Sequence, residues 1–444
     1  MSPNACAAAG WSASGPHVPG RGERGRVQTF LTSYAVDLHS APFLLLGILL
    51  LGGLVGGEAV RRLFNLPRTT GYVLTGIAAG PSGLGWVAPD VLQSAQFFVY
   101  LAIGVILFEL GHRLPMPGRG LDRRLLGLSL ADINGTFLAV GAVMLALGFG
   151  IGGALFAAAV AVSTSPAITI ATTSDVGADG PATERLFALV AFNNCAAFVA
   201  LAVALPILPL EGLTASLAGH APPVAYVAGS LALGTALAAM ACQGARWLGP
   251  QPEHQHLLLL GLICIGAGLP LGVQMSPLLT LLSLGVATRW MDVRGDVVGL
   301  RISSDARVFL VITFVLAGAA LEIGLIVAHW REVAAFALAR IAGRMLALRA
   351  AAGPLGVDAR EAHWLGIGLL PKSSIALVLL GNAGPLSGDV GERLANVLLG
   401  AIALMQLVGP ICTQMCSRGL GEARRLKGAD PVTWMLARLP RRNG

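Results

Sequence analysis

Charged side chains are scarce in this 444-residue chain: Asp, Glu, Lys and Arg together make up 12% of it. Aromatic residues account for only 6%, and the mean hydropathy is +0.74. About 25% of the residues in a typical soluble domain are charged, so the composition excludes that class. It is typical of an all-α, polytopic membrane protein whose helices lie in a lipid bilayer.

The chain also lacks the patterns that soluble enzymes use. It contains no phosphate-binding glycine loop, no catalytic-triad arrangement and no zinc-ligand spacing, so we expect no enzymatic activity, no cofactor and no resident metal. Cysteine is rare, with six in the chain. Cys195, Cys242, Cys264 and Cys412 fall within apolar runs, where we expect them to act as small apolar residues.

Apolar runs recur along the chain at the length of about 20 residues that crosses a bilayer, and they predict about thirteen transmembrane helices. Residues 1–38 lack such a run and are expected to form a disordered tail. Residues 39–417 form the predicted membrane domain, and residues 418–444 form a C-terminal tail. The predicted spans are 40–60, 68–87, 91–111, 124–149, 152–174, 185–209, 223–247, 256–273, 275–291, 306–327, 332–353, 363–383 and 393–416.

Basic residues are concentrated in the loops, or joints, that follow the first, third, ninth and last predicted spans. These spans are all odd-numbered, so the joints that follow them lie on the same side of the membrane. Cytoplasmic loops are enriched in Lys and Arg, so these joints are predicted to be cytoplasmic, with the N-terminus outside and the C-terminus inside. The net charge of +7 therefore indicates topology and no nucleic-acid partner. Arginines in the N-terminal tail depart from the rule. The basic residues are Arg61, Arg62, Arg68, Arg113, Arg119, Arg123, Arg124, Arg289, Arg294, Arg301, Arg418, Arg424, Arg425 and Lys427.

Two predicted spans are interrupted near their middles by polar residues and proline. The fifth is broken at residues 163–166, which read STSP, and the twelfth at residues 371–374, which read PKSS. Backbone groups freed at membrane depth are tolerated only where protein or a watery cavity surrounds them. The two spans are seven apart and so run in opposite directions, which predicts inverted repeats with two crossing broken helices around an ion site.

Four segments carry a family resemblance. Residues 70–81 read TGYVLTGIAAGP, residues 106–111 read ILFELG, and the two breaks follow in order. Together they resemble the monovalent cation:proton antiporter superfamily, specifically its bacterial sodium/proton exchanger-like branches, over about residues 40–416. The resemblance implies a homodimer in the bacterial inner membrane. It also implies a core, formed by residues 124–209 and 332–416, that rocks against a scaffold.

The chain departs from this family at the expected site. The sixth-span pair is typically Asn-Asp, Gln-Asp or Asp-Asp in the family, and its aspartate binds cation and proton alternately. Here the pair is Asn193-Asn194, and an amide offers oxygen to a cation but does not exchange a proton. Ser374 replaces a glutamate that often follows the second break, and Lys372 stands where the family usually has arginine.

Asp132, within the fourth span, is the leading candidate for a carboxylate that has taken over proton exchange; the alternative is a structural partner for Arg344 or Lys372. Arg340 and Arg344 share a helix face and resemble the family's basic position, with snorkelling toward the cytoplasmic surface as the alternative. Asp175 is expected to be solvated in a cytoplasmic loop. The candidate transport site comprises Asp132, Ser163, Thr164, Ser165, Asn193, Asn194, Arg344, Lys372, Ser373 and Ser374.

We therefore predict a secondary transporter that exchanges a monovalent cation, sodium or potassium, for protons by alternating access. Without the usual aspartate, coupling must use Asp132, use Lys372, or be absent. Two alternatives remain open. In the first, the same fold carries an anion or carboxylate at Arg344 and Lys372, beside a half-helix N-terminus. In the second, the protein is a non-transporting membrane sensor or assembly partner.

Overall fold

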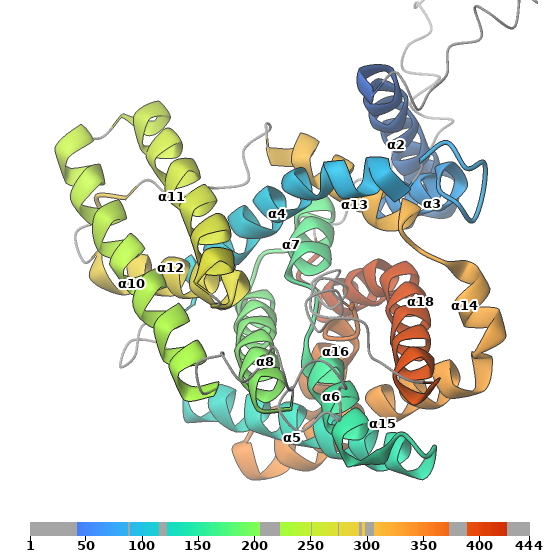
Figure 1. Ribbon diagram of the computed structural model, residues 1–444. Helices are drawn as coiled ribbons and strands as arrows, with labels where there is room; N and C mark the ends of the chain where they lie inside the picture. The colour runs from blue at the N-terminus through green and yellow to red at the C-terminus, as the bar shows by residue number, and fades with distance from the viewer. Residues whose placement is uncertain are drawn as a thin grey trace, which may run out of the picture.

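The computed structural model describes residues 42–87, 89–114, 122–204, 223–249, 251–273, 275–292, 295–297, 306–372 and 389–423 (Figure 1). Over these ranges the regular elements are helices, with no strand. The predicted tail at residues 1–38, Ser373 and Ser374 lie outside them. The helices are α2 (Pro42–Phe64), α3 (Arg68–Ala79), α4 (Pro89–His112), α5 (Arg123–Ala146), α6 (Gly150–Val162), α7 (Pro166–Asp175), α8 (Pro181–Ala204), α10 (Pro223–Leu248), α11 (Pro252–Gly272), α12 (Pro277–Met291), α13 (Ala306–Ala319), α14 (Ile323–Ala328), α15 (Trp330–Leu355), α16 (Ala359–Gly368) and α18 (Asp389–Gly419).

Six of the described segments are long and apolar enough to cross a membrane. Shorter apolar helices occur at Val99–His112 and Leu310–Ala319. These segments confirm the predicted all-helical, multi-pass class, while the count of about thirteen spans stays a prediction. The six segments are Leu44–Phe64, Arg123–Ala146, Gly150–Asp175, Pro181–Leu201, Ala225–Leu248 and Asp389–Gly419.

The predicted span 306–327 is two helices rather than one. Between α13 and α14, the Ser82 hydroxyl donates to the Leu321 carbonyl at 2.7 Å and accepts the Ile323 N–H at 3.3 Å. A side chain that satisfies backbone groups in this way replaces helical hydrogen bonds. The apolar sequence alone did not indicate this interruption.

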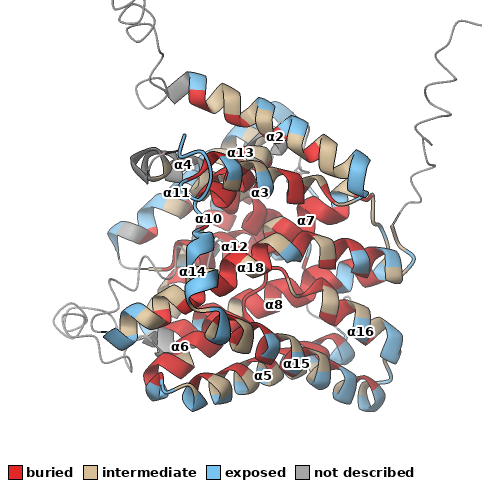
Figure 2. Ribbon diagram, turned by 90° about the vertical axis from the view of Figure 1, so that its right-hand side faces the viewer, coloured by how far each residue is buried: buried red, intermediate tan, exposed pale blue. Residues whose placement is uncertain are grey.

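The helices pack in two groups that touch each other sparingly. In one group α5 packs against α6 and α15, and α18 packs against α16. In the other, α3 packs against α2 and α13, and α12 packs against α10; α4 spans this second group from α12 to α13 (Figure 1). Buried residues concentrate in α7, α8 and α18 at the centre (Figure 2), and the outer faces of α5 and α15 expose apolar side chains such as Leu138 and Leu338. Such faces suit contact with lipid.

Two of the basic joints, those after the first and the last predicted spans, meet on one face of the molecule. Arg68, before α3, pairs with Asp175 at the end of α7 at 2.8 Å. Arg418, at the end of α18, donates to the Asn65 side chain at 3.1 Å. We refer to this face as the Arg68 face. That it lies in the cytoplasm stays a prediction.

On the Arg68 face, the segment after α18 folds back onto the start of α8. The Glu422 carboxylate accepts from the Ala182 N–H at 2.8 Å, the Thr183 N–H at 2.7 Å and the Thr183 hydroxyl at 2.6 Å. The first N–H groups of a helix have no partner within the helix. Glu422 therefore caps α8 from a position 240 residues away.

Replacing this cap with Glu422→Ala is expected to lower the free energy of unfolding by about 1–2 kcal/mol, because the first-turn N–H groups of α8 lose their acceptor and a favourable charge. Chemical denaturation in detergent micelles measures the change. The control is Glu392→Ala, which removes an exposed carboxylate from the start of α18 and should change stability by no more than about 0.5 kcal/mol. Equal effects from the two substitutions would contradict the capping role.

Candidate functional site

The two predicted breaks lie against each other at the centre of the molecule. The Ser165 N–H donates to the Pro371 carbonyl at 3.0 Å, and the Thr164 hydroxyl donates to the Leu369 carbonyl at 3.2 Å. The first break divides α6 from α7, and the second follows the end of α16. Residues about 200 positions apart thus complete each other's hydrogen bonding at membrane depth, as irregular backbone there requires.

Local sequence explains why α7 starts where it does. The Ser165 hydroxyl accepts the Ile168 N–H at 3.2 Å, and Pro166 occupies the first helical turn. Serine is a favoured N-cap and proline a favoured first residue, since its missing N–H would have no helical partner. Ser165 is therefore partly explained as the N-cap of α7, and Ser163 as the C-cap of α6, where its hydroxyl donates to the Val160 carbonyl at 3.0 Å.

Three buried cations surround the breaks, and their donors satisfy the backbone carbonyls where α6 and α16 end. Arg340, Arg344 and Lys372 each have no exposed surface. The last carbonyls of a helix have no partner within it and carry partial negative charge. Arg340 donates to the carbonyls of Ala161 (2.8 Å), Leu370 (2.6 Å), Ser163 (3.1 Å) and Leu369 (3.2 Å), and to Met405 Sδ (3.2 Å).

These contacts use the full donor capacity of two of the cations. A guanidinium has five N–H donors and an ammonium has three, and Arg340 makes five contacts. Lys372 Nζ contacts the Val160 carbonyl, the Ser163 carbonyl at 3.2 Å and the Ser163 hydroxyl at 2.7 Å. The positive charge at the breaks thus stabilises two helix ends.

Asp132 lies beside the breaks, where the third cation meets it. One carboxylate oxygen, Oδ1, accepts from Arg344 Nε at 2.7 Å, and neither side chain is exposed. The other, Oδ2, accepts from Asn193 Nδ2 at 2.7 Å. The other Arg344 nitrogens donate to the carbonyls of Leu369 and, at 3.4 Å, Val162. A single buried carboxylate is therefore linked both to the amide pair and to the broken helices.

Close helix packing brings Asp132 and Arg344 within reach. Gly135 on α5 faces Gly343 on α15, and a Cβ added at Gly343 would lie 2.5 Å from the Gly135 carbonyl oxygen. Small residues let two helix backbones approach closely. The carboxylate, one turn from this crossing, therefore meets a guanidinium that is 212 positions away in the sequence.

Three buried oxygen atoms at this site have no hydrogen-bond partner within the part of the chain that the structure describes. They are Asn193 Oδ1, Asn194 Oδ1 and Thr136 Oγ1. The Asn194 amide nitrogen donates to the carbonyls of Thr164 and Val190, each at 2.8 Å, so its oxygen is the unpaired atom. Buried polar atoms normally have a partner, and amide and hydroxyl oxygens are ligands for hard cations.

Comparison with known proteins decides the family. Residues 46–418 match the family described as sodium/hydrogen exchanger, transmembrane. The chain belongs to this exchanger family. Its members are transporters rather than enzymes, and the resemblance to cation:proton antiporters drawn from the sequence motifs is confirmed.

Individual relatives agree with this assignment. The glutathione-regulated potassium-efflux system protein KefC of Salmonella schwarzengrund is 27% identical over 416 residues, which cover 89% of this chain and 64% of that protein. KefC of Salmonella paratyphi B gives the same values. The chain thus spans less than two thirds of the length of these relatives. The solved structure of the sodium proton antiporter MjNhaP1 from Methanocaldococcus jannaschii matches this chain with a TM-score of 0.64 and 16% sequence identity. The match covers 87% of this chain and 99% of that one, so the two proteins share a fold.

In this exchanger-family member, most of the residues predicted for the site lie together. Arg344 and Arg340 do not snorkel: both are fully buried and bonded to backbone carbonyls, so that alternative was wrong. Ser373 and Ser374 lie outside the described residues. The residues brought together at the breaks are Asp132, Ser163, Thr164, Ser165, Asn193, Asn194, Arg344 and Lys372.

Two features of the structure were not predicted from the sequence. Asp175 was expected to be solvated, but its side chain is only 11% exposed and is bound to Arg68. The sequence did not indicate this ion pair because Arg68 lies on a different helix, far from Asp175 in the sequence. Thr136, whose buried hydroxyl has no partner among the described residues, was not predicted as a site residue. Its spacing of four residues from Asp132, which places both on one helix face, was the available signal.

Proposed function

We propose that this chain is a monovalent cation:proton antiporter that works by alternating access and exchanges its proton at Asp132. The observation that carries the proposal is the fully buried Asp132 carboxylate, held between Arg344 and Asn193 beside the crossed breaks. Membership of the exchanger family supports the transport class. The relatives are named for potassium efflux and for sodium proton antiport, which supports sodium or potassium as the proposed ion.

Antiport requires that cation and proton exclude each other, and the charges around Asp132 supply that exclusion. Ionised Asp132 neutralises the neighbouring Arg344, which lowers the electrostatic cost of bringing a cation to the breaks. A proton on Asp132 cancels its negative charge and leaves Arg344 uncompensated. The added positive charge then disfavours the cation, so each ion lowers the affinity for the other.

We propose that Asn193 and Asn194 ligate the cation through their unpartnered oxygens, with Thr136 and the hydroxyls of the first break nearby. Asn193→Ala and Asn194→Ala are each expected to raise the cation concentration for half-maximal exchange about tenfold, because each removes a buried oxygen ligand. The matched control is Asn134→Ala. Its exposed amide donates to the Leu130 carbonyl within α5, and its loss should leave that concentration unchanged. An unchanged half-maximal concentration in both Asn193→Ala and Asn194→Ala, or an equal change in the control, would refute the assignment.

Alternating access also requires two bodies that move. We propose that the core is formed by residues 124–209 and 332–416 and moves against the group that contains α2–α4 and α10–α13. Sparse packing between these groups supports this division. We further propose a homodimer in the bacterial inner membrane, a location supported by the bacterial relatives.

The charge at the breaks favours one second candidate, transport of an anion or carboxylate. Arg340, Arg344 and Lys372 outnumber the single carboxylate of Asp132 among the described residues at the breaks. An anion would need their N–H donors, and Arg340 and Lys372 already direct theirs at backbone carbonyls and neighbouring groups. The cation proposal is therefore the stronger.

Purified protein in proteoliposomes that contain a pH-sensitive dye tests the two functions. We expect a pulse of sodium or potassium to move protons in the opposite direction and chloride to have no effect. Proton movement that follows an anion instead would favour the second candidate. No movement with any cation, from protein shown to be folded, would overturn the antiport proposal.

A further inference from the structure

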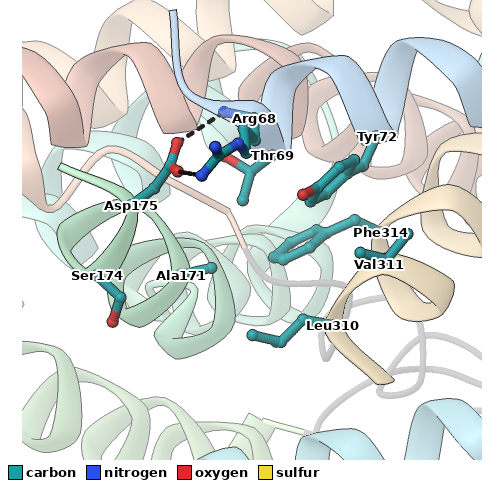
Figure 3. Close-up of a pocket in the computed structure, with 9 residues that line it drawn as sticks. All are labelled: Arg68, Thr69, Tyr72, Ala171, Ser174, Asp175, Leu310, Val311 and Phe314. Carbon is teal, nitrogen blue, oxygen red and sulfur yellow. Dashed lines mark hydrogen bonds and ion pairs between the residues drawn. The ribbon is translucent and has the colours of Figure 1, made fainter. Parts of the chain in front are cut away.

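A cleft of about 200 Å³ opens on the Arg68 face between the two groups of helices. Figure 3 shows that it lies between α7, which contributes Asp175, Ser174 and Ala171, and two helices of the other group. Tyr72 on α3 and Phe314 on α13 form an aromatic wall on one side of the cleft, and the bonded pair Arg68 and Asp175 lies on the other side. The cleft thus lies where the two groups would separate.

Arg68 and Asp175 are joined by two bonds. The Arg68 backbone N–H donates to Asp175 Oδ2 at 2.9 Å, and Nη1 donates to Oδ1 at 2.8 Å. Paired, charge-assisted hydrogen bonds of this kind fix geometry as well as supplying energy. Arg68 also binds Glu58 of α2 through Nε at 3.1 Å, so the pair ties α7 to two helices of the other group.

A second link lies just inside the ion pair. The hydroxyl oxygens of Thr69 on α3 and Thr172 on α7 are 3.3 Å apart, and both side chains are buried. From Thr172, α7 continues as an unbroken helix to Ser165 and the first break. A displacement of its Asp175 end is therefore transmitted to the residues around Asn194, whose amide is bonded to Thr164.

We propose that Arg68 and Asp175 form a gate on this face, and that their separation opens the cleft toward the breaks. They act as positioning residues: neither touches the proposed cation site. The transport role of the gate rests on the antiport proposal, but its effect on access does not.

Access is measured by alkylation of a single cysteine placed beyond the gate. Ile168 is 1% exposed and lies one helical turn from Thr172 toward the break. The tested protein carries Ile168→Cys, with alanine or serine replacing Cys6, Cys195, Cys242, Cys264, Cys412 and Cys416. A membrane-impermeant maleimide is applied to the Arg68 face. We expect Arg68→Gln and Asp175→Asn each to increase the modification rate about tenfold, because each removes charge-assisted hydrogen bonds that hold the cleft closed.

Two further variants separate a gate from general loosening. The reversed pair Arg68→Asp/Asp175→Arg should be modified more slowly than either single variant. Arg185→Gln breaks an ion pair with Glu361 that joins α8 and α16 on the same face but within one group, and should leave the rate unchanged. Equal rates in all variants, or an Arg185→Gln rate as fast as that of Asp175→Asn, would overturn the gate whether or not the protein exchanges cations.

A reversible crosslink tests the gate in transport. Because the Thr69 and Thr172 hydroxyls are adjacent, Thr69→Cys/Thr172→Cys should form a disulfide on oxidation. We expect oxidation to stop cation-driven proton movement and reduction to restore it. Unchanged exchange in fully crosslinked protein would overturn the gate, whereas absence of exchange in the unmodified protein overturns the antiport proposal and leaves the alkylation result to decide the gate.

Discussion

Asp132→Asn is expected to abolish cation-driven proton movement and to lower the free energy of unfolding by about 3–5 kcal/mol, the cost of removing one partner from a buried ion pair. Transport is lost because an amide does not exchange a proton. Stability falls because Arg344 keeps its charge in a fully buried position without the carboxylate 2.7 Å away. Dye-loaded proteoliposomes measure the first effect, and chemical denaturation in detergent micelles measures the second.

The double variant Asp132→Asn/Arg344→Gln distinguishes a missing proton site from a damaged fold. Removing both charges eliminates the unpaired guanidinium, and replacing a whole buried pair by neutral groups is often close to neutral for stability. We expect the double variant to regain most of the lost stability and to remain inactive in exchange. Proton movement in the double variant would show that Asp132 is not the exchanging group.

Arg340→Gln is expected to destabilise the two broken helices by about 2–6 kcal/mol, because at least two buried carbonyls lose their donor. The carbonyls of Ala161 and Leu370 accept hydrogen bonds from Arg340 at 2.8 and 2.6 Å. A glutamine side chain is shorter and has fewer donors, so it does not bond to both carbonyls. Denaturation in detergent micelles gives the change in stability, and cysteine alkylation near the breaks reports local opening.

Arg349→Gln is the matched control for that substitution. Arg349 lies on the same helix, α15, but is exposed, so its replacement should alter stability by no more than about 0.5 kcal/mol. Similar stability of Arg340→Gln and the native protein would contradict the role of Arg340 in holding the helix ends.

The elements of the fold that depend on local sequence were predictable. Apolar run length predicted the six segments that are long and apolar enough to cross a membrane. The STSP sequence predicted the interruption between α6 and α7, because serine capping and the missing proline N–H act within one turn. The break between α13 and α14 was not predictable in this way. Its stabilising group, the Ser82 hydroxyl, comes from a position 239 residues distant.

The sequence predicted which residues lie at the site better than it predicted which of them bond to one another. The structural alternative for Asp132 left its partner open between Arg344 and Lys372, and charge alone does not choose between them. The structure pairs it with Arg344, while Lys372 binds the end of α6. That choice depends on the close crossing of α5 and α15 at Gly135 and Gly343 and on the meeting of two helix ends. Neither is a local property of the sequence.

The measurement that tests the central claim most directly is the cation dependence of exchange at different pH values. If cation and proton exclude each other through Asp132, the cation concentration for half-maximal exchange should rise as the pH falls, with the maximal rate unchanged. The rate would be recorded in dye-loaded proteoliposomes with the membrane potential clamped. A half-maximal concentration that is the same at acidic and alkaline pH would contradict competition between the two ions at Asp132.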